Sequence, residues 1–294
     1  MPLIHTQTFH IRHYECDAYS YLAEHNYLRY MQAAAFGASA AAGYDAARYE
    51  ELGHHWLVRE TEIEHYAPLR YGDAVQIRTW VADFRRIRSR RAYEFRRPES
   101  GALVAQAFTD WVYLDTTTLR PVTIPEEMHR AFFPDGDRPA RQPRPRFPDA
   151  PPPPAGAHRL RRPVQWQDID PAHHVNNARY LSHIEDCAVE AVMAHGWTPA
   201  RIDQLGYALA PRAQRIEYKM PGLLGDELDL TLWLSDVGQT EQVRHCTVTR
   251  AGDGALLARA RTDWAWVAAG SRQPKPFPAA FLADLAPLVA GGVR

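Results

Sequence analysis

The amino-acid sequence repeats itself at a fixed offset of 153 residues, as the pairs Asp17 with Asp170 and Tyr27 with Tyr180 illustrate. Longer matches are Gly72–Asp73 with Gly225–Asp226 and Thr109–Trp111 with Thr262–Trp264. A period of this length far exceeds the roughly 20 to 50 residues of solenoid repeats. It therefore predicts two copies of one domain, each large enough to bury its own core.

A proline-rich segment separates the two copies. Nine prolines lie between Pro134 and Pro154, and the last four are consecutive. This composition favours an extended, semi-rigid spacer, although a proline-rich run can also dock a partner domain. We expect an N-terminal domain at residues 1–133, a linker at 134–156 and a C-terminal domain at 157–294.

Each copy shows the pattern of one long helix followed by strands. Helices are expected at 24–42 and 177–195, the second ending before the capping residue Gly196. Strands are expected where apolar residues recur, at 75–81, 93–95, 228–234 and 243–248. An apolar sheet face needs a cover, and the long helix is the element available for it. Each copy should therefore be an α+β unit.

A short strand should also precede each long helix. Phe9 and Ile11 mark it in the first copy, and Val164 and Trp166 mark it in the second.

The composition excludes several classes of protein. The chain has 34 basic and 35 acidic residues, a balance that suggests no nucleic-acid or other polyanionic partner. Its three cysteines are odd in number and widely spaced, which favours a reducing cytoplasm over a disulfide framework or a zinc site. We see no secretory signal and no apolar run long enough to span a bilayer. The sequence predicts a cytoplasmic protein without membrane insertion.

The loop before the second long helix concentrates chemically useful residues. Asp170, His174 and Asn177 are spaced by four and three residues, so they should share one face at the helix start. There the exposed backbone N–H groups can stabilise an oxyanion, while a carboxylate acts as base or nucleophile. We predict these three residues to be catalytic, with Asn176 and Tyr180 beside them binding substrate.

The corresponding loop of the first copy shares the aspartate but differs at the two other candidate catalytic positions. Asp17 matches Asp170, but Tyr21 replaces the histidine and Glu24 replaces the asparagine. One site should therefore be catalytic, while Tyr21 and Glu24 serve substrate binding at the other. Asp17 is the second choice for the catalytic carboxylate.

Paired histidines raise the question of a metal site. His54–His55 and His173–His174 are adjacent in sequence, so the two side chains of each pair point in different directions. No cysteine or carboxylate spacing completes a known site. We predict neither a metal nor a bound cofactor.

These residues resemble a known family. The string from Asp168 through Asp170 and His174–Asn177 to Tyr180 is similar to the signature of acyl-acyl-carrier-protein (acyl-ACP) thioesterases. These belong to the broader 4-hydroxybenzoyl-CoA thioesterase-like superfamily. The stretches 66–80 and 111–125 resemble further segments of that family. The resemblance covers nearly the whole chain except the linker.

The resemblance implies a double-hotdog fold, in which each of two units wraps an antiparallel sheet around a central helix. It implies hydrolysis of fatty acyl thioesters, with Asp170 and His174 in the catalytic roles. Two positions depart from the family: Ala172 stands where an asparagine is common, and Pro221–Gly222 stands where a later catalytic acid is expected. Asn177 or a first-copy residue would then complete the catalytic set.

A second resemblance concerns the first-copy loop. Tyr14–Glu15, Asp17–Ala18 and Asn26–Arg29 are similar to the small bacterial acyl-CoA thioesterases, which would make Asp17 the catalytic carboxylate. We predict a thioesterase acting on acyl-ACP or acyl-CoA, in a pseudo-dimeric chain that could form a homodimer. The alternatives are a hotdog acyl-thioester dehydratase or hydratase, and a non-catalytic acyl-thioester binding protein.

Overall fold

The computed structural model describes residues 1–136, 139–269 and 273–291, which form two compact units. Unit 1 comprises Met1–Cys16 and Asn26–Arg146, and unit 2 comprises Asp17–His25 and Phe147–Arg294. The short segment Asp17–His25 thus groups with the second half of the chain, although it belongs to the first copy of the repeat.

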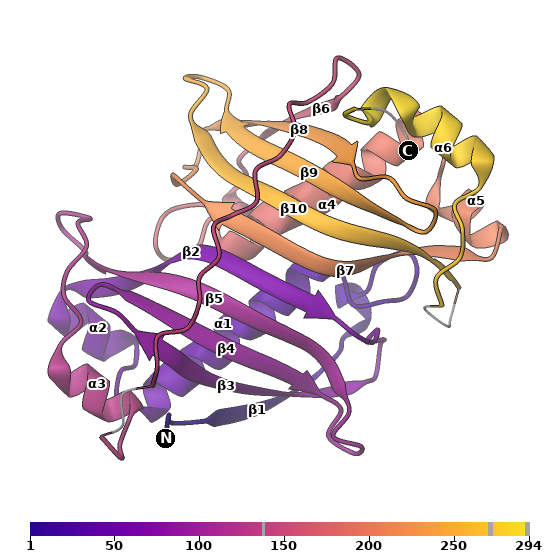
Figure 1. The fold of residues 1–294 in the computed structure, drawn as a ribbon. Coiled ribbons are helices and arrows are strands. Elements are labelled where there is room, and N and C mark those ends of the chain that lie inside the picture. The colour runs from indigo at the N-terminus through magenta and orange to yellow at the C-terminus, as the bar shows by residue number, and fades with distance from the viewer. Residues whose placement is uncertain (137–138, 270–272, 292–294) are drawn as a thin grey trace. The chain divides into compact units, whose positions relative to one another are not determined.

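Unit 1 is an antiparallel sheet with one long helix against it (Figure 1). The strand order is β1-β3-β4-β5-β2. The strands are β1 (His5–His10), β2 (His54–His65), β3 (Ala74–Phe84), β4 (Arg88–Arg96) and β5 (Leu103–Asp115), and the helices are η1 (His13–Glu15), α1 (Glu24–Ala41), α2 (Ala46–Leu52) and α3 (Glu126–Phe132). The first two residues of α1, Glu24 and His25, group with unit 2.

Unit 2 repeats this topology with the strand order β6-β8-β9-β10-β7. Its strands are β6 (His158–Pro163), β7 (Tyr207–Tyr218), β8 (Glu227–Ser235), β9 (Glu241–Arg250) and β10 (Leu256–Ala268), and its helices are η2 (Trp166–Asp168), α4 (Asn177–Ala194), α5 (Pro199–Gln204), α6 (Ala279–Leu285) and η3 (Ala286–Leu288).

The predicted α+β class is therefore confirmed, and its physical basis is visible in the sequence pattern. On β8 the alternating residues Leu228, Leu230, Leu232 and Leu234 are all buried, as expected for a strand with one face in a core. The helix α4 ends next to Gly196, whose positive φ of 78° allows the chain to turn away.

The short strand before α4 was predicted too far toward the C-terminus. β6 ends at Pro163, and Trp166 instead begins the 3-10 helix η2 with its side chain 79% exposed. The turn forms because the Gln165 backbone N–H donates to the carboxylate of Asp168, which closes the turn. In unit 1 the prediction is right for Phe9 in β1, while Ile11 follows the strand.

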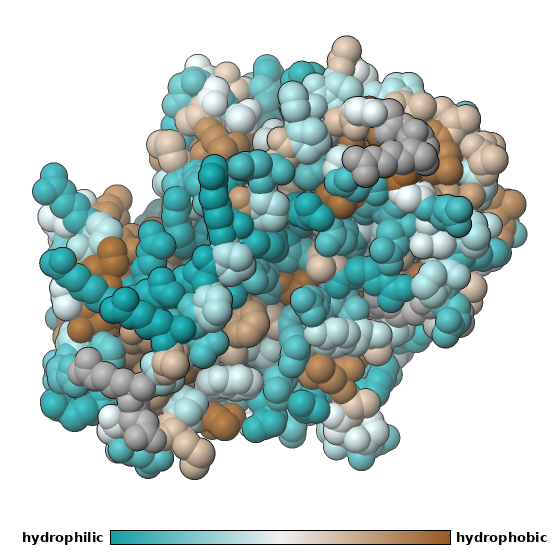
Figure 2. Space-filling view, viewed as in Figure 1, coloured by the Kyte–Doolittle hydropathy of each residue, from teal (hydrophilic) through white to brown (hydrophobic). Residues whose placement is uncertain are grey.

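The proline-rich segment is bonded to the sheet of unit 1. After α3 it runs across the face opposite α1, over which Figure 2 shows mostly hydrophilic residues. There Arg144 bonds the buried carboxylate of Asp83 and that of Asp110, and the Gln142 backbone N–H donates to Asp83. Asp110 in turn accepts from Arg90. Ion pairs and hydrogen bonds thus fix this stiff segment to the sheet.

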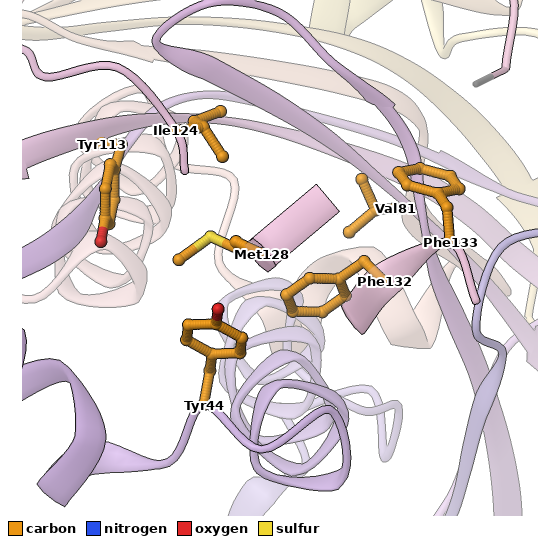
Figure 3. Close-up of a cluster of buried hydrophobic side chains, with 7 residues drawn as sticks. All are labelled: Tyr44, Val81, Tyr113, Ile124, Met128, Phe132 and Phe133. Atoms are coloured by element: carbon orange, nitrogen blue, oxygen red, sulfur yellow. The ribbon is translucent and has the colours of Figure 1, made fainter. Parts of the chain in front are cut away.

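A cluster of aromatic and aliphatic side chains closes one end of the core of unit 1 (Figure 3). Phe132 and Phe133 of the α3 region meet Phe84 of β3 edge-on, at ring-centre distances of 5.6 and 5.7 Å. Such pairs add to the hydrophobic gain of burial. The buried members are Tyr44, Val81, Tyr113, Ile124, Met128, Phe132 and Phe133.

Candidate active site

The carboxylate of Asp170 is held in the loop just before α4. Its Oδ1 accepts the backbone N–H of Ala172 at 2.9 Å, and its Oδ2 accepts Nδ2 of Asn176 at 3.0 Å. The side chain is 19% exposed, so it is oriented by the protein and still reachable. A carboxylate in this state can take a proton from water or attack a carbonyl carbon.

His174 lies beside this carboxylate, as its spacing predicted. Its Nδ1 is 3.9 Å from Asp170 Oδ1 and 3.3 Å from the backbone carbonyl oxygen of Val175. When Nδ1 donates its proton to Val175, Nε2 keeps a lone pair for proton exchange with a substrate. The two side chains are similarly exposed, so both are available to one reactant.

The start of α4 is capped by Asn176. Its Oδ1 accepts the backbone N–H of Ala178 while its Nδ2 holds Asp170, so one side chain joins the helix start to the carboxylate. The backbone N–H of Asn177 forms no hydrogen bond with any residue in the described ranges. This donor, at the positive end of a helix, suits a developing oxyanion.

A second acid in the loop has a structural role that the sequence did not reveal. Asp168 is fully buried, and it accepts hydrogen bonds from the Gln165 backbone and from Nε of Arg179 at 2.7 Å. Burial alone would raise the pKa of Asp168, but these bonds hold it below its usual value. Glu15 stands at the corresponding position of unit 1 and accepts a hydrogen bond from Tyr30. Comparing identities between the copies misses this acid, because one copy has Glu and the other Asp.

Tyr180, predicted to bind substrate, lies in the core behind the loop. Its hydroxyl accepts the backbone N–H of Gly222 at 2.8 Å, and burial raises its pKa to about 12. A Cβ atom at Gly222 would lie 3.0 Å from that hydroxyl. The family's later acid therefore has no room at this position. Nearby, the hydroxyl of Tyr218 donates to the carbonyl of Asn177, a contact not anticipated from the sequence.

The loop of the first copy forms the same turn. Asp17 Oδ1 accepts the backbone N–H groups of Tyr19 and Tyr21 at 2.9 and 3.0 Å. Tyr21, predicted to contact substrate, packs with Tyr19 against an apolar cluster of unit 2. The turn therefore survives in both loops, while their surroundings differ.

The start of α1 already has a carboxyl partner. The backbone N–H groups of Glu24 and His25 both donate to Oε1 of Glu185 on α4, at 2.6 and 3.3 Å, and the His25 ring bonds its Oε2. Burial raises the pKa of Glu185 to about 8, against the opposing effect of these N–H bonds. This helix start is thus occupied by the protein itself, unlike the start of α4.

The described residues contain no group of three or more His, Cys, Asp or Glu arranged to hold a metal ion. Among the helices in those same ranges, none has the length and apolarity to cross a membrane.

Comparison with known proteins shows a similarity to thioesterases in both halves of the chain. Residues 2–132 match the model of the acyl-ACP thioesterase N-terminal domain, and residues 164–285 match that of the thioesterase-like superfamily. The first half of the chain is thus similar to acyl-ACP thioesterases, and the second half is similar to the thioesterase-like superfamily. This confirms the family resemblance seen in the sequence.

Acyl carrier protein thioesterases align along most of the chain. A chloroplastic palmitoyl-acyl carrier protein thioesterase from Arabidopsis thaliana is 23% identical over 271 residues, covering 89% of this chain and 64% of the relative. The chain thus spans less than two thirds of the length of that relative.

Solved structures share the fold. A Lactobacillus plantarum protein named as an oleoyl thioesterase gives a TM-score of 0.73 at 21% identity, covering 90% of this chain and 96% of that one. The 12:0-ACP thioesterase of Umbellularia californica gives 0.68 at 20% identity, covering 92% and 98%. The predicted tandem hotdog fold is confirmed.

Proposed function

We propose that this chain hydrolyses fatty acyl thioesters of acyl carrier protein, or of CoA, to a free acid and a thiol. The similarity to acyl-ACP thioesterases supports the reaction class. The observation that carries the proposal is the start of α4, where an oriented carboxylate and imidazole lie beside the Asn177 N–H, which forms no hydrogen bond with any described residue.

In this reaction the thioester carbonyl oxygen would receive the Asn177 N–H. Asp170 would accept a proton from the attacking water, whose oxygen bonds to the carbonyl carbon. His174, carrying a proton on Nε2 as well as on Nδ1, would give the Nε2 proton to the sulfur as the carbon–sulfur bond breaks. It would then regain a proton from Asp170, which restores both groups. Asn176 would hold Asp170 in place, and Tyr180 would support the loop from behind.

Two features favour the α4 site over its first-copy counterpart. Tyr21 replaces the histidine there, so a proton carrier for neutral pH is missing at that position. The N–H groups of Glu24 and His25 already donate to Glu185. We therefore retain Asp17, Tyr21 and Glu24 as residues of a non-catalytic counterpart.

The biological setting follows as part of the proposal. An acyl carrier protein would be the partner, in the cytoplasm, with a place in fatty acid synthesis. The three thiols are free, which suits a reducing compartment. A homodimer of the chain remains a prediction from its two-copy architecture.

The deciding experiment is thiol release from acyl-ACP and acyl-CoA ladders, comparing Asp170→Asn with Asp17→Asn. The two are matched, because an amide oxygen can still accept the turn N–H groups in either loop. We expect Asp170→Asn to lower kcat by about a hundredfold or more, and Asp17→Asn to leave it near the parent value. Loss with Asp17→Asn alone would move the site to the first copy.

A chain that releases no thiol from any substrate would not be a thioesterase. The dehydratase or hydratase alternative would then leave the thioester intact while changing its acyl chain. The binding-protein alternative would retain the ligand unchanged. The relatives compared above are named as thioesterases, which supports neither alternative.

A further inference from the structure

The two copies of the repeat surround the acid of their short 3-10 helix with different side chains. In unit 1 the acid is Glu15 of η1, and the Tyr30 hydroxyl donates to its carboxylate at 2.5 Å. At the offset of 153 residues these two positions become Asp168 of η2 and His183 of α4. A tyrosine hydroxyl keeps its proton near neutral pH, whereas a histidine gains and loses one there. A titratable group thus lies beside this acid in the copy that carries the candidate site.

His183 is buried against the carboxylate of Asp168. Its side chain is 7% exposed, and its Nε2 lies 3.3 Å from Oδ2 of Asp168. Asp168 is bonded more closely to other groups: Oδ2 accepts the Gln165 backbone N–H at 2.9 Å, and Oδ1 lies 2.7 and 2.6 Å from Nε and Nη2 of Arg179. Among the described residues, Nε2 of His183 has no partner in hydrogen-bond geometry. The contact between His183 and Asp168 is therefore electrostatic, and it depends on whether the imidazole carries a charge.

One residue joins Asp168 to the candidate catalytic carboxylate. The backbone carbonyl oxygen of Asp168 accepts the backbone N–H of Asn176 at 2.8 Å. The side chain of Asn176 in turn holds Asp170 through Nδ2 and caps α4 through Oδ1. A displacement of Asp168 therefore displaces the residue that orients Asp170.

The charged groups around His183 oppose one another. Asp168 of η2 and Asp186 of α4 favour the protonated imidazole, whereas Arg162 of β6 and Arg179 of α4 disfavour it. The core-facing side chains of β8, which also packs against α4, are leucines. Burial is the largest influence, and it lowers the pKa of His183 below its usual value of 6.5.

The ordered loop therefore binds a proton at His183 more weakly than an opened loop does. An opening that removes Asp168 and lets water reach His183 restores its pKa to about 6.5, the value of an exposed histidine. Acid stabilises the state that binds the proton more strongly, which here is the opened one. The contribution of neutral His183 to the order of the loop is thus fully present above pH 6.5 and is lost as the pH falls below it.

We propose that His183 is a positioning residue of the α4 site: in its neutral form it leaves Asp168 free to hold the loop that carries Asn176 and Asp170, and a proton on it releases that loop. The inference rests on the proposed thioesterase function and adds a regulation to it. Hydrolysis is then attenuated in mild acid by a residue that touches neither the substrate nor the reacting groups.

The test compares the parent with His183→Gln, whose amide does not titrate and can still donate to Asp168. Amide hydrogen exchange of peptides covering residues 165–177 measures how often the loop opens. Between pH 7.5 and pH 5.5, after correction for the intrinsic exchange rate, opening should rise by up to about tenfold in the parent and stay nearly constant in the variant.

Thiol release from acyl-ACP should follow the same pattern. Between the same two pH values, kcat of the parent should fall more steeply than kcat of His183→Gln. The difference should lie in kcat rather than in KM, because the loop orients a reacting group. Asp170 and His174 are common to both proteins, so their own titration cancels in the comparison.

Two further variants keep the result interpretable. His195→Gln removes a histidine at the far end of α4 and should keep the acid response of the parent. The double change Asp168→Glu with His183→Tyr installs the pair that unit 1 uses, and it should abolish the response. This double variant tests the inference even if His183→Gln fails to fold.

The possible failures are distinguishable. If no substrate releases thiol, the proposed function is wrong, and hydrogen exchange still tests the link between His183 and the loop. Equal opening in acid by the parent and His183→Gln would overturn the inference, because another group would then bind the proton. A parent loop that opens no more often at pH 5.5 would overturn it too. Opening that depends on His183 but leaves kcat of parent and variant parallel would refute the positioning role.

Discussion

Asp168 and Asp170 are two residues apart and have opposite tasks. Asp168 is fully buried and holds Arg179, so it fixes the loop and cannot meet a substrate. Asp170 is partly exposed and bonded only through neutral donors in its own loop, apart from the nearby His174. A pair of like carboxylates is thus divided by its surroundings into a structural acid and a candidate catalytic one.

Asn176 should matter more to activity than its neighbour Asn177. Asn176→Ser keeps a side-chain cap for α4 but loses the amide that holds Asp170, so kcat should fall while the thermal midpoint hardly changes. Asn176→Ala should also cost about 1 kcal/mol of unfolding free energy, since the cap is lost. Chemical denaturation and thiol-release kinetics would measure the two effects. Equal activity of parent and Ser variant would contradict the assigned contact.

His245 should make unit 2 sensitive to mild acid. Burial and the charge of Arg261 lower its pKa from 6.5 to about 4, and its Nε2 bonds the hydroxyl of Ser235 at 2.8 Å. In the unfolded chain His245 binds a proton below about pH 6.5, whereas in the folded chain it stays neutral down to about pH 4. The contribution of neutral His245 to the free energy of unfolding is therefore fully present above pH 6.5 and is lost as the pH falls from 6.5 to about 4.

The corresponding measurement compares the parent with His245→Gln, which does not titrate. Between pH 7 and pH 5 the parent should lose about 2 kcal/mol more unfolding free energy than the variant. Urea denaturation at the two pH values would show it. Parallel losses in both proteins would mean that His245 already binds a proton in the folded state.

At the scale of elements, the proline-rich segment behaves as part of the sheet. Arg144→Met would remove the guanidinium that bonds the buried Asp83 and leave only the more distant Arg85, at 3.8 Å, so it should cost about 3 kcal/mol. Arg141→Met, an exposed arginine of the same segment, is the matched control and should be neutral. Denaturation midpoints and protease sensitivity near residue 144 would both respond. A segment that stays protected in Arg144→Met would show that its proline stiffness suffices.

The elements themselves were largely predictable, because their signals are local. The periodicity of the leucines was enough to predict β8, and the repeat was enough to predict that helices start at both 24 and 177. The turn at Trp166 was missed because a capping bond from Gln165 to Asp168 overrides an apolar pattern. For the candidate site, spacing correctly brought His174 near Asp170. It could not show that Asn176 would turn toward the carboxylate, since that depends on how the helix start is capped.

At the scale of the molecule, the two halves of the sequence are not separate folding units. Glu185 in unit 2 receives its hydrogen bonds from Glu24 and His25, which lie far away in sequence. No local pattern could reveal this pairing, because it joins residues about 160 positions apart.

A fragment of residues 147–294 should therefore be less stable than the same region in the full chain. In the fragment Glu185 loses its partners, so Glu185→Met should stabilise it, whereas in the full chain the same change should destabilise. Thermal midpoints of the four proteins would test this reversal of sign. A variant with the same effect in both settings would contradict the described contacts.

The shared turn of Asp17 and Asp170 has a consequence for the history of this chain. Each carboxylate accepts backbone N–H groups of its own loop, so drift that removed it would damage the turn before it touched any chemistry. Selection for folding alone can thus preserve the acid in a silent copy. The turn does not need the side chain of His174. Among duplicated chains of this kind, the residue at the His174 position should therefore show better than the aspartate which copy is catalytic.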